Sequence, residues 1–117
     1  MLSSYPTEPI NIITGQDIEI PVTMVAPPWN WMYDNIQHVI VKENETELTR
    51  TGDIFMLPET TQDIVITVPS DAISSGTHIL TLVTELRYEF EWYNDGNYSV
   101  TTVISECTTP ISNISVE

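Results

Sequence analysis

The chain has 117 residues, 41% of them hydrophobic, which is enough for a single domain, residues 1–117, with a modest core. Seventeen acidic residues stand against three basic ones, and the formal net charge is -14. Such a surface repels phosphate backbones and anionic lipid headgroups, so the composition argues against nucleic-acid-binding and membrane-surface proteins. The charge indicates either a solubilising surface or complementarity to a basic partner.

Cysteine usage points to the compartment in which the protein folds. Cys107 is the only cysteine, which excludes an internal disulfide and with it a secreted disulfide scaffold. The first residues contain neither a basic segment nor an apolar run, so no signal peptide is expected. No apolar stretch approaches the roughly 20 residues that cross a bilayer. We therefore expect the protein to fold in a reducing cytoplasm.

Short β-rich segments separated by Pro, Gly, Asn and Asp make up most of the chain, and helical periodicity is nearly absent. In chain order, strands are expected at Asn11–Ile13, Asp17–Val25, Ile36–Glu43, Leu48–Thr51, Asp53–Leu57 and Asp63–Pro69. Ser70–Gly76 has room for a single helical turn. A long strand from Thr77 and a return strand ending near Ser105 follow, and residues 107–117 are expected to form an extended tail or an edge strand.

About seven or eight strands with short connections are typical of an immunoglobulin-like sandwich. We predict an all-β fold of antiparallel strands with a long C-terminal hairpin, although a jelly roll or a small barrel has a similar pattern. Within Asp17–Val25, apolar and polar residues alternate, which predicts one buried face. Pro21 can donate no ladder hydrogen bond, which favours a sheet edge or a bulge in this strand.

The C-terminal hairpin alternates apolar and charged residues over an unusual length. A three-residue loop at Asn94–Gly96 would pair Trp92 with Tyr98, whereas a two-residue loop would set apolar residues against polar ones. We therefore predict the three-residue loop, with Gly96 in a left-handed conformation. A strand this long either bends over its own core or projects as an arm onto a neighbouring subunit. One apolar face would then be shared by Phe90, Trp92, Tyr98 and Val100.

The segment Ala26–Asn35, with the sequence APPWNWMYDN, is the most unusual connection. Its two prolines enforce an extended entry, which would set Trp29, Trp31 and Tyr33 on one side. Folded back, these aromatic side chains would close the open end of the domain. Exposed, they would fill a pocket of a protein partner or, together with Asp34, stack on a sugar.

Patterns for catalysis, cofactors and metals are absent from the sequence, so we expect no enzyme activity, no cofactor and no metal site. His38 and His78 are interpreted as ordinary strand residues, and Cys107 has no activating neighbour in the sequence. Two polar clusters supply too few convergent oxygens for calcium, which needs about six to eight. They are interpreted as solvated turn residues and comprise Glu43, Glu45 and Glu47 in one cluster and Asn94, Asp95 and Asn97 in the other.

The segment TVPSDAISSGTHILTLVTEL, residues 67–86, resembles immunoglobulin-like modules of bacteriophage virions, in which a strand and a short turn ending in glycine precede a long apolar strand. Such modules occur in capsid decoration proteins, head fibres and baseplate components. The resemblance implies a non-enzymatic virion protein, assembled in the host cytoplasm, that docks onto a capsid or tail. Its partners would be other virion proteins or copies of itself in an oligomer.

Two sets of candidate site residues follow from these alternatives. For a virion protein, the expected interface residues are Phe90, Trp92, Tyr98 and Val100, with Trp29 and Trp31. The alternative function is a carbohydrate-binding module, and its expected sugar-binding residues are Trp29, Trp31, Tyr33 and Asp34.

Overall fold

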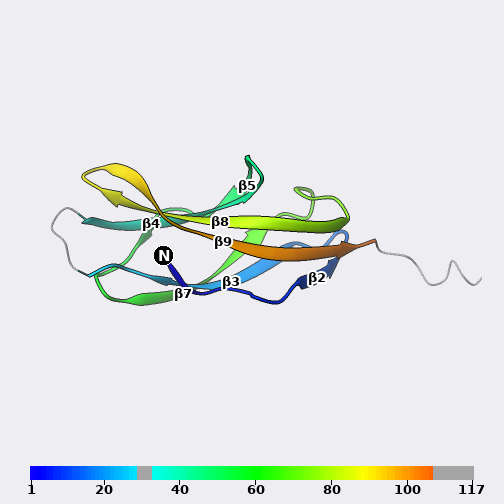
Figure 1. Ribbon diagram of the computed structural model, residues 1–117, viewed down its shortest axis with the longest axis horizontal. Helices are drawn as coiled ribbons and strands as arrows, with labels where there is room; N and C mark the ends of the chain where they lie inside the picture. The colour runs from blue at the N-terminus through cyan, green and yellow to red at the C-terminus, as the bar shows by residue number, and fades with distance from the viewer. Residues whose placement is uncertain (29–32, 107–117) are drawn as a thin grey trace, which may run out of the picture.

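The computed structural model describes residues 1–28 and 33–106, which form two facing β-sheets and no helix (Figure 1). The strands are β1 (Leu2–Ser4), β2 (Ile10–Ile13), β3 (Ile18–Val25), β4 (Tyr33–Glu43), β5 (Thr46–Arg50), β6 (Ile54–Phe55), β7 (Thr61–Val68), β8 (Gly76–Tyr88) and β9 (Glu91–Ser105). The prediction of an all-β fold is confirmed. The described residues contain nine strands, where about seven or eight were expected.

One sheet has three strands in the order β1-β3-β7, and the other has six, in the order β2-β9-β8-β4-β5 with β6 beside β4. The pairings are antiparallel except that of β2 with β9, so the expectation of only antiparallel strands is wrong at this pair. The chain between β1 and β2 crosses from one sheet to the other without reversing direction (Figure 1). β2 therefore pairs with β9 in parallel, and no hairpin connects the two strands.

Apolar side chains fill the space between the two sheets. The alternation predicted for β3 is confirmed, because every second residue of this strand is buried. Gln37 of β4 is also fully buried, and its Nε2 donates a hydrogen bond to the Val25 carbonyl of β3 at 3.2 Å. This bond joins the two layers at a polar point within the core. The largest fully buried apolar side chains are Ile18, Ile20, Met24, Val39, Val41, Val68, Leu80, Leu82 and Val100.

The long C-terminal hairpin is present, but its turn is not where the sequence places it. β8 ends at Tyr88 and β9 begins at Glu91, so Glu89 and Phe90 alone form the turn. The prediction of a three-residue loop at Asn94–Gly96 is therefore wrong. That segment lies within β9 and forms a bulge opposite β8.

The bulge changes which face of the sheet each residue of β9 occupies. Thr84 pairs with Gly96, and Glu85 pairs with Asn94, so Asp95 is the extra residue. One inserted residue moves the following side chains to the opposite face. The expected apolar face shared by Trp92 with Tyr98 is therefore wrong.

Gly96 has the positive φ that the sequence predicts, at 141°, but it serves the bulge rather than a turn. A Cβ at this position would lie 2.9 Å from ring carbons of Tyr98. The Tyr98 hydroxyl in turn accepts a hydrogen bond from the Leu2 backbone N–H at 2.9 Å. The absence of a side chain at Gly96 therefore allows Tyr98 to fasten β1 to the hairpin.

Two further expectations concern the connections. Ser70–Gly76 forms no helical turn; instead, the Ala72 N–H donates to the Pro69 carbonyl at 3.0 Å in an ordinary turn. Residues 107–117, expected to be a tail or an edge strand, lie outside the described residues, as does Cys107. In the part of the chain that is described, no helix has the length and apolar character of a membrane span.

Candidate functional site

The end of the β8–β9 hairpin, residues 88–93, curls away from the sheet at the end of the molecule opposite β2 (Figure 1). We call these residues the hairpin tip. Its turn residues Glu89 and Phe90 both have positive φ, at 50° and 67°. Two consecutive positive φ values give a turn that matches the twist of a hairpin, and Asn-Gly is the usual sequence. A bulky residue in this conformation is strained by about 1–3 kcal/mol.

Asp34 of β4 compensates for this strain. Its Oδ2 accepts hydrogen bonds from the Phe90 backbone N–H at 2.8 Å and from Arg87 Nε at 3.0 Å. The Arg87 guanidinium also lies 5.6 Å from the centroid of the Phe90 ring, within the range of a cation–π contact. The Asp34 carboxylate thus holds the backbone of the turn directly. It also holds the Arg87 guanidinium, which lies beside the Phe90 ring.

The hairpin tip presents aromatic surface to solvent. Phe90 is 81% exposed and Tyr93 is 50% exposed. The rings of Tyr88 and Tyr93 lie 6.3 Å apart in an edge-to-face arrangement. A hollow of about 400 Å³ beside them is lined by Leu86, Tyr88, Glu89, Tyr93, Asn94 and Asp95.

Trp92 lies at the base of the hairpin tip and packs outside the core. It pairs with Arg87, on the face of the sheet that points away from the other layer. Its ring lies over the imidazole of His38, with the two centroids 4.0 Å apart. The expectation that Trp92 belongs to an apolar face with Val100 is wrong because of the bulge at Asp95.

His38 is more than the ordinary strand residue that the sequence predicts. Its Nε2 lies 2.7 Å from Glu85 Oε1, and its Nδ1 lies 3.5 Å from Asp53 Oδ1. The imidazole is held between two carboxylates and covered by Trp92. His38 is only 3% exposed, so a solute has almost no access to either ring nitrogen. The cluster therefore braces β4 against β8 and β9 below the hairpin tip.

The remaining residues of the expected interface are not brought together. Val100 is 1% exposed in the core, and Tyr98 is partly buried with its ring 5.0 Å from that of Tyr5. Trp29 and Trp31 lie outside the described residues. Of the expected interface residues within the described ranges, only Phe90 is largely exposed and has its backbone N–H held by a side chain, that of Asp34.

The expected sugar site is described only in part. Trp29 and Trp31 fall outside the described residues, and Tyr33 is the first residue of β4. The Asp34 side chain is 17% exposed, and Oδ2 is occupied by the two hydrogen bonds at the turn. Sugar binding at this segment stays a prediction.

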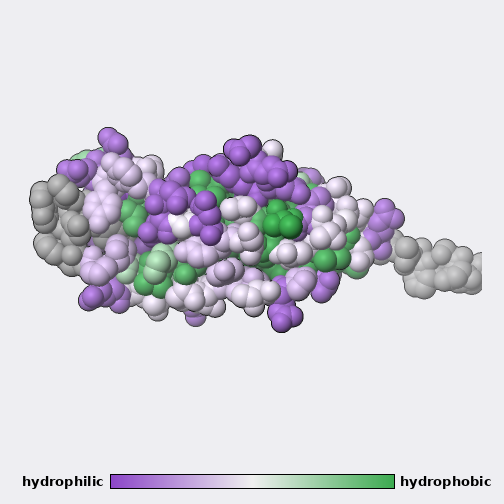
Figure 2. Space-filling model, in the orientation of Figure 1, coloured by the Kyte–Doolittle hydropathy of each residue, from purple (hydrophilic) through white to green (hydrophobic). Residues whose placement is uncertain are grey.

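Internal partners occupy several oxygens of the two polar clusters. Glu43 pairs with His78 and Glu47 with Arg50, and hydrophilic residues gather over β5 (Figure 2). In the second cluster, Asn94 Nδ2 donates to Asn97 Oδ1 at 2.8 Å, and Asp95 accepts from the amino group of Met1 at 2.6 Å. Within residues 1–28 and 33–106, no three His, Cys, Asp or Glu side chains are grouped so as to hold a metal ion.

His78 lies near the start of β8, at the end of the long hairpin opposite the tip. Its Nδ1 lies 2.6 Å from Glu43 Oε2, and its Nε2 lies 2.9 Å from the Ser74 carbonyl. The hydrogen bond to Glu43 raises the pKa of His78 above its ordinary value, and burial opposes this only in part. On β5, the hydrogen bond from Arg50 lowers the pKa of Glu47.

Comparison with known proteins finds no protein-family model, no curated protein and no solved structure that matches the chain.

Proposed function

We propose that the protein is a non-enzymatic structural component of a bacteriophage virion. In this proposal the two sheets form an immunoglobulin-like sandwich, and the hairpin tip docks onto a larger assembly such as a capsid or tail. The proposal combines the resemblance of residues 67–86 to virion modules with the aromatic surface of the tip.

The observation that carries the docking proposal is the exposure of Phe90, at 81%, in a turn whose backbone is strained. Strained residues persist where the surrounding structure fixes them, and they cluster at functional sites. Here Asp34 and Arg87 fix the turn. Because the backbone of Phe90 is already ordered, docking loses little additional conformational entropy, and aromatic anchors dominate interface energetics.

The charge around Phe90 indicates the chemistry of the partner. Glu89 and Glu91 flank Phe90 and are both exposed, whereas Arg87 is paired with Asp34. The whole chain carries a formal charge of -14. The partner is therefore an apolar pocket with a basic rim, and docking weakens as salt screens these charges.

The test is the protein content of purified phage particles whose genome encodes the chain. Mass spectrometry of these particles is expected to find the chain in a fixed ratio to the major capsid or tail protein. Purified chain, added to particles from which it has been removed, is expected to rebind, and less well in high salt. A chain present in the lysate but absent from the particles would contradict the proposal.

A further inference from the structure

β7 occupies the edge of the three-stranded sheet. It pairs with β3 in an unbroken register from Thr61 opposite Val25 to Val68 opposite Ile18. No strand of the described residues pairs with its other side. The remaining backbone N–H and C=O groups along that side are a template for another strand.

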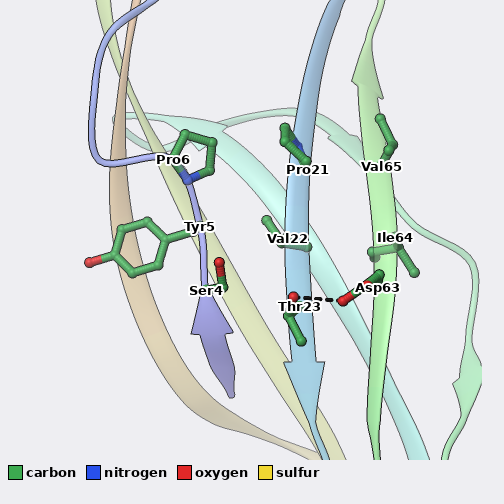
Figure 3. A pocket seen from close by; sticks show the side chains of 9 residues that line it. All are labelled: Ser4, Tyr5, Pro6, Pro21, Val22, Thr23, Asp63, Ile64 and Val65. Atoms are coloured by element: carbon green, nitrogen blue, oxygen red, sulfur yellow. Dashed lines mark hydrogen bonds between the residues drawn. The ribbon is translucent and has the colours of Figure 1, made fainter.

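Natural edge strands are usually short or protected by lysine, proline or a bulge, and β7 has none of these features. Its only charged residue is Asp63, whose carboxylate accepts a hydrogen bond from Thr23 Oγ1 at 2.7 Å (Figure 3). Val65 stands beside Pro21 on the outer face of the sheet and is 58% exposed. Although the whole chain has a charge of -14, β7 itself carries a single charged residue, so this edge repels another strand little.

Beside β7 lies a hollow that could take inward side chains of an added strand. A hollow of about 380 Å³ separates residues 64–67 of β7 from residues 50–54, which precede and begin β6. Ile54 and Ile64 lie on opposite sides of this hollow and are half-buried. A strand added to β7 would bring its inward side chains over this apolar surface and remove it from water.

We propose that two copies of the chain pair their β7 strands antiparallel, about a two-fold axis at Val65, and so join two three-stranded sheets into one six-stranded sheet. Val65 then lies opposite the partner's Val65, and Ile64 opposite the partner's Ile66. Asp63 lies opposite the partner's Thr67, a polar pair that brings no like charges together.

The side chains select this register over its neighbours. A slip of one residue between the strands would place the partner's inward side chains on the outer face. An axis at Ile64 would set Asp63 against Val65, and an axis at Asp63 would set two carboxylates against each other. The axis at Val65 sets Ile64 against Ile66 on the inward face and Val65 against Val65 on the outer face, with one mismatch within β7, Gln62 opposite Val68. An axis at Ile66 would instead set Val65 against Thr67 on the outer face.

Pro21 supports the same position of the two-fold axis, at Val65. It has no N–H to donate, and its partner across the β3–β7 ladder is Val65. A proline fits a ladder where its nitrogen is not needed, so we expect a non-hydrogen-bonded pair at this position. The N–H and C=O of Val65 would then point away from β3, toward the free edge.

Cross-linking tests this register directly. In a Cys107→Ser background, Val65→Cys would place two cysteines directly opposite each other as a hydrogen-bonded pair, with Cα atoms about 5.5 Å apart, which suits a disulfide. Mild oxidation is expected to convert this variant into a covalent dimer. The matched control is Thr67→Cys, on the same face of the same strand. Its two cysteines would lie about 14 Å apart, four residues along the partner strand, and should not cross-link.

Sedimentation of unmodified and charged variants tests whether the pairing occurs without a cross-link. Wild type is expected to form a dimer at about 100 μM. Val65→Lys sets two ammonium groups opposite each other and should weaken dimerisation at least about tenfold, whereas Thr67→Lys faces the partner's Asp63 and should not. A monomeric wild type, equal cross-linking of the two cysteine variants, or equal effects of the two lysines would overturn the proposal. None of these outcomes depends on docking through Phe90.

Discussion

The Asp34 carboxylate accepts a hydrogen bond from the backbone N–H of Phe90 at 2.8 Å, although the two residues are 56 positions apart in the chain. This contact fixes a turn whose own sequence, Glu-Phe, is poorly suited to positive φ values. A turn of Asn-Gly would form without such help. The Asp34 contact therefore stabilises a strained backbone conformation in which the Phe90 side chain is exposed to solvent.

If strain is stored at the turn, Phe90→Gly should stabilise the protein. Glycine adopts positive φ freely, and the relieved strain exceeds the loss of the cation–π contact with Arg87. We expect the free energy of unfolding, measured in urea, to rise by about 1 kcal/mol. Asp34→Ala is the counterpart and should lower it by about 1–3 kcal/mol, because it leaves the Phe90 N–H without its partner. A Phe90→Gly variant less stable than wild type would show that the turn is not strained.

Gly96→Ala should be strongly destabilising. The added methyl group would contact ring carbons of Tyr98 at 2.9 Å, at a φ of 141° that alanine does not tolerate. We expect a loss of about 2–4 kcal/mol in the free energy of unfolding. Gly52→Ala is the matched control, because its Cβ would meet no atom within 4 Å, and its effect should stay within about 0.5 kcal/mol. Equal effects of the two substitutions would contradict the proposed role of Gly96.

His78 should make stability depend on pH. Its pKa in the folded protein is raised by the hydrogen bond to Glu43, so protonation favours the folded state. The stabilisation is complete below the unfolded-state pKa of about 6.5 and is lost as pH rises through the raised folded-state pKa. The stability difference between wild type and His78→Asn should therefore be largest on the acid side and shrink toward alkaline pH. Glu43→Gln should abolish most of this dependence, and a difference that is constant with pH would rule out the linkage.

Local patterns in the sequence predict the strands but not the register of the hairpin. Alternation in β3 correctly gives its buried face, because side chains of a strand alternate without exception while the ladder is unbroken. The same rule fails between Trp92 and Tyr98, because one extra residue at Asp95 exchanges the two faces. The sequence Asn-Asp-Gly is typical of a turn, yet here it supplies the positive φ of a bulge.

The candidate site depends on contacts between distant parts of the chain, which short patterns do not contain. The actual turn, Glu89–Phe90, follows from Asp34 on another strand, and no rule based on turn composition selects it. The environment of His38 arises in the same way, since Glu85 is 47 positions away. Phe90 stays a predicted interface residue, and the hydrogen bond that holds its turn comes from Asp34 on a distant strand.

The most direct test of docking through the hairpin tip is the rebinding of Phe90→Ser to particles that lack the chain. Ile79→Ser is the matched control, because Ile79 is an exposed apolar residue, at 60%, on β8 outside the tip. Loss of an aromatic anchor typically costs 2 kcal/mol or more, so we expect Phe90→Ser to bind at least about thirtyfold more weakly and Ile79→Ser to bind as wild type does. Equal binding by Phe90→Ser and wild type, with both proteins folded, would contradict the assignment of the hairpin tip as the docking surface.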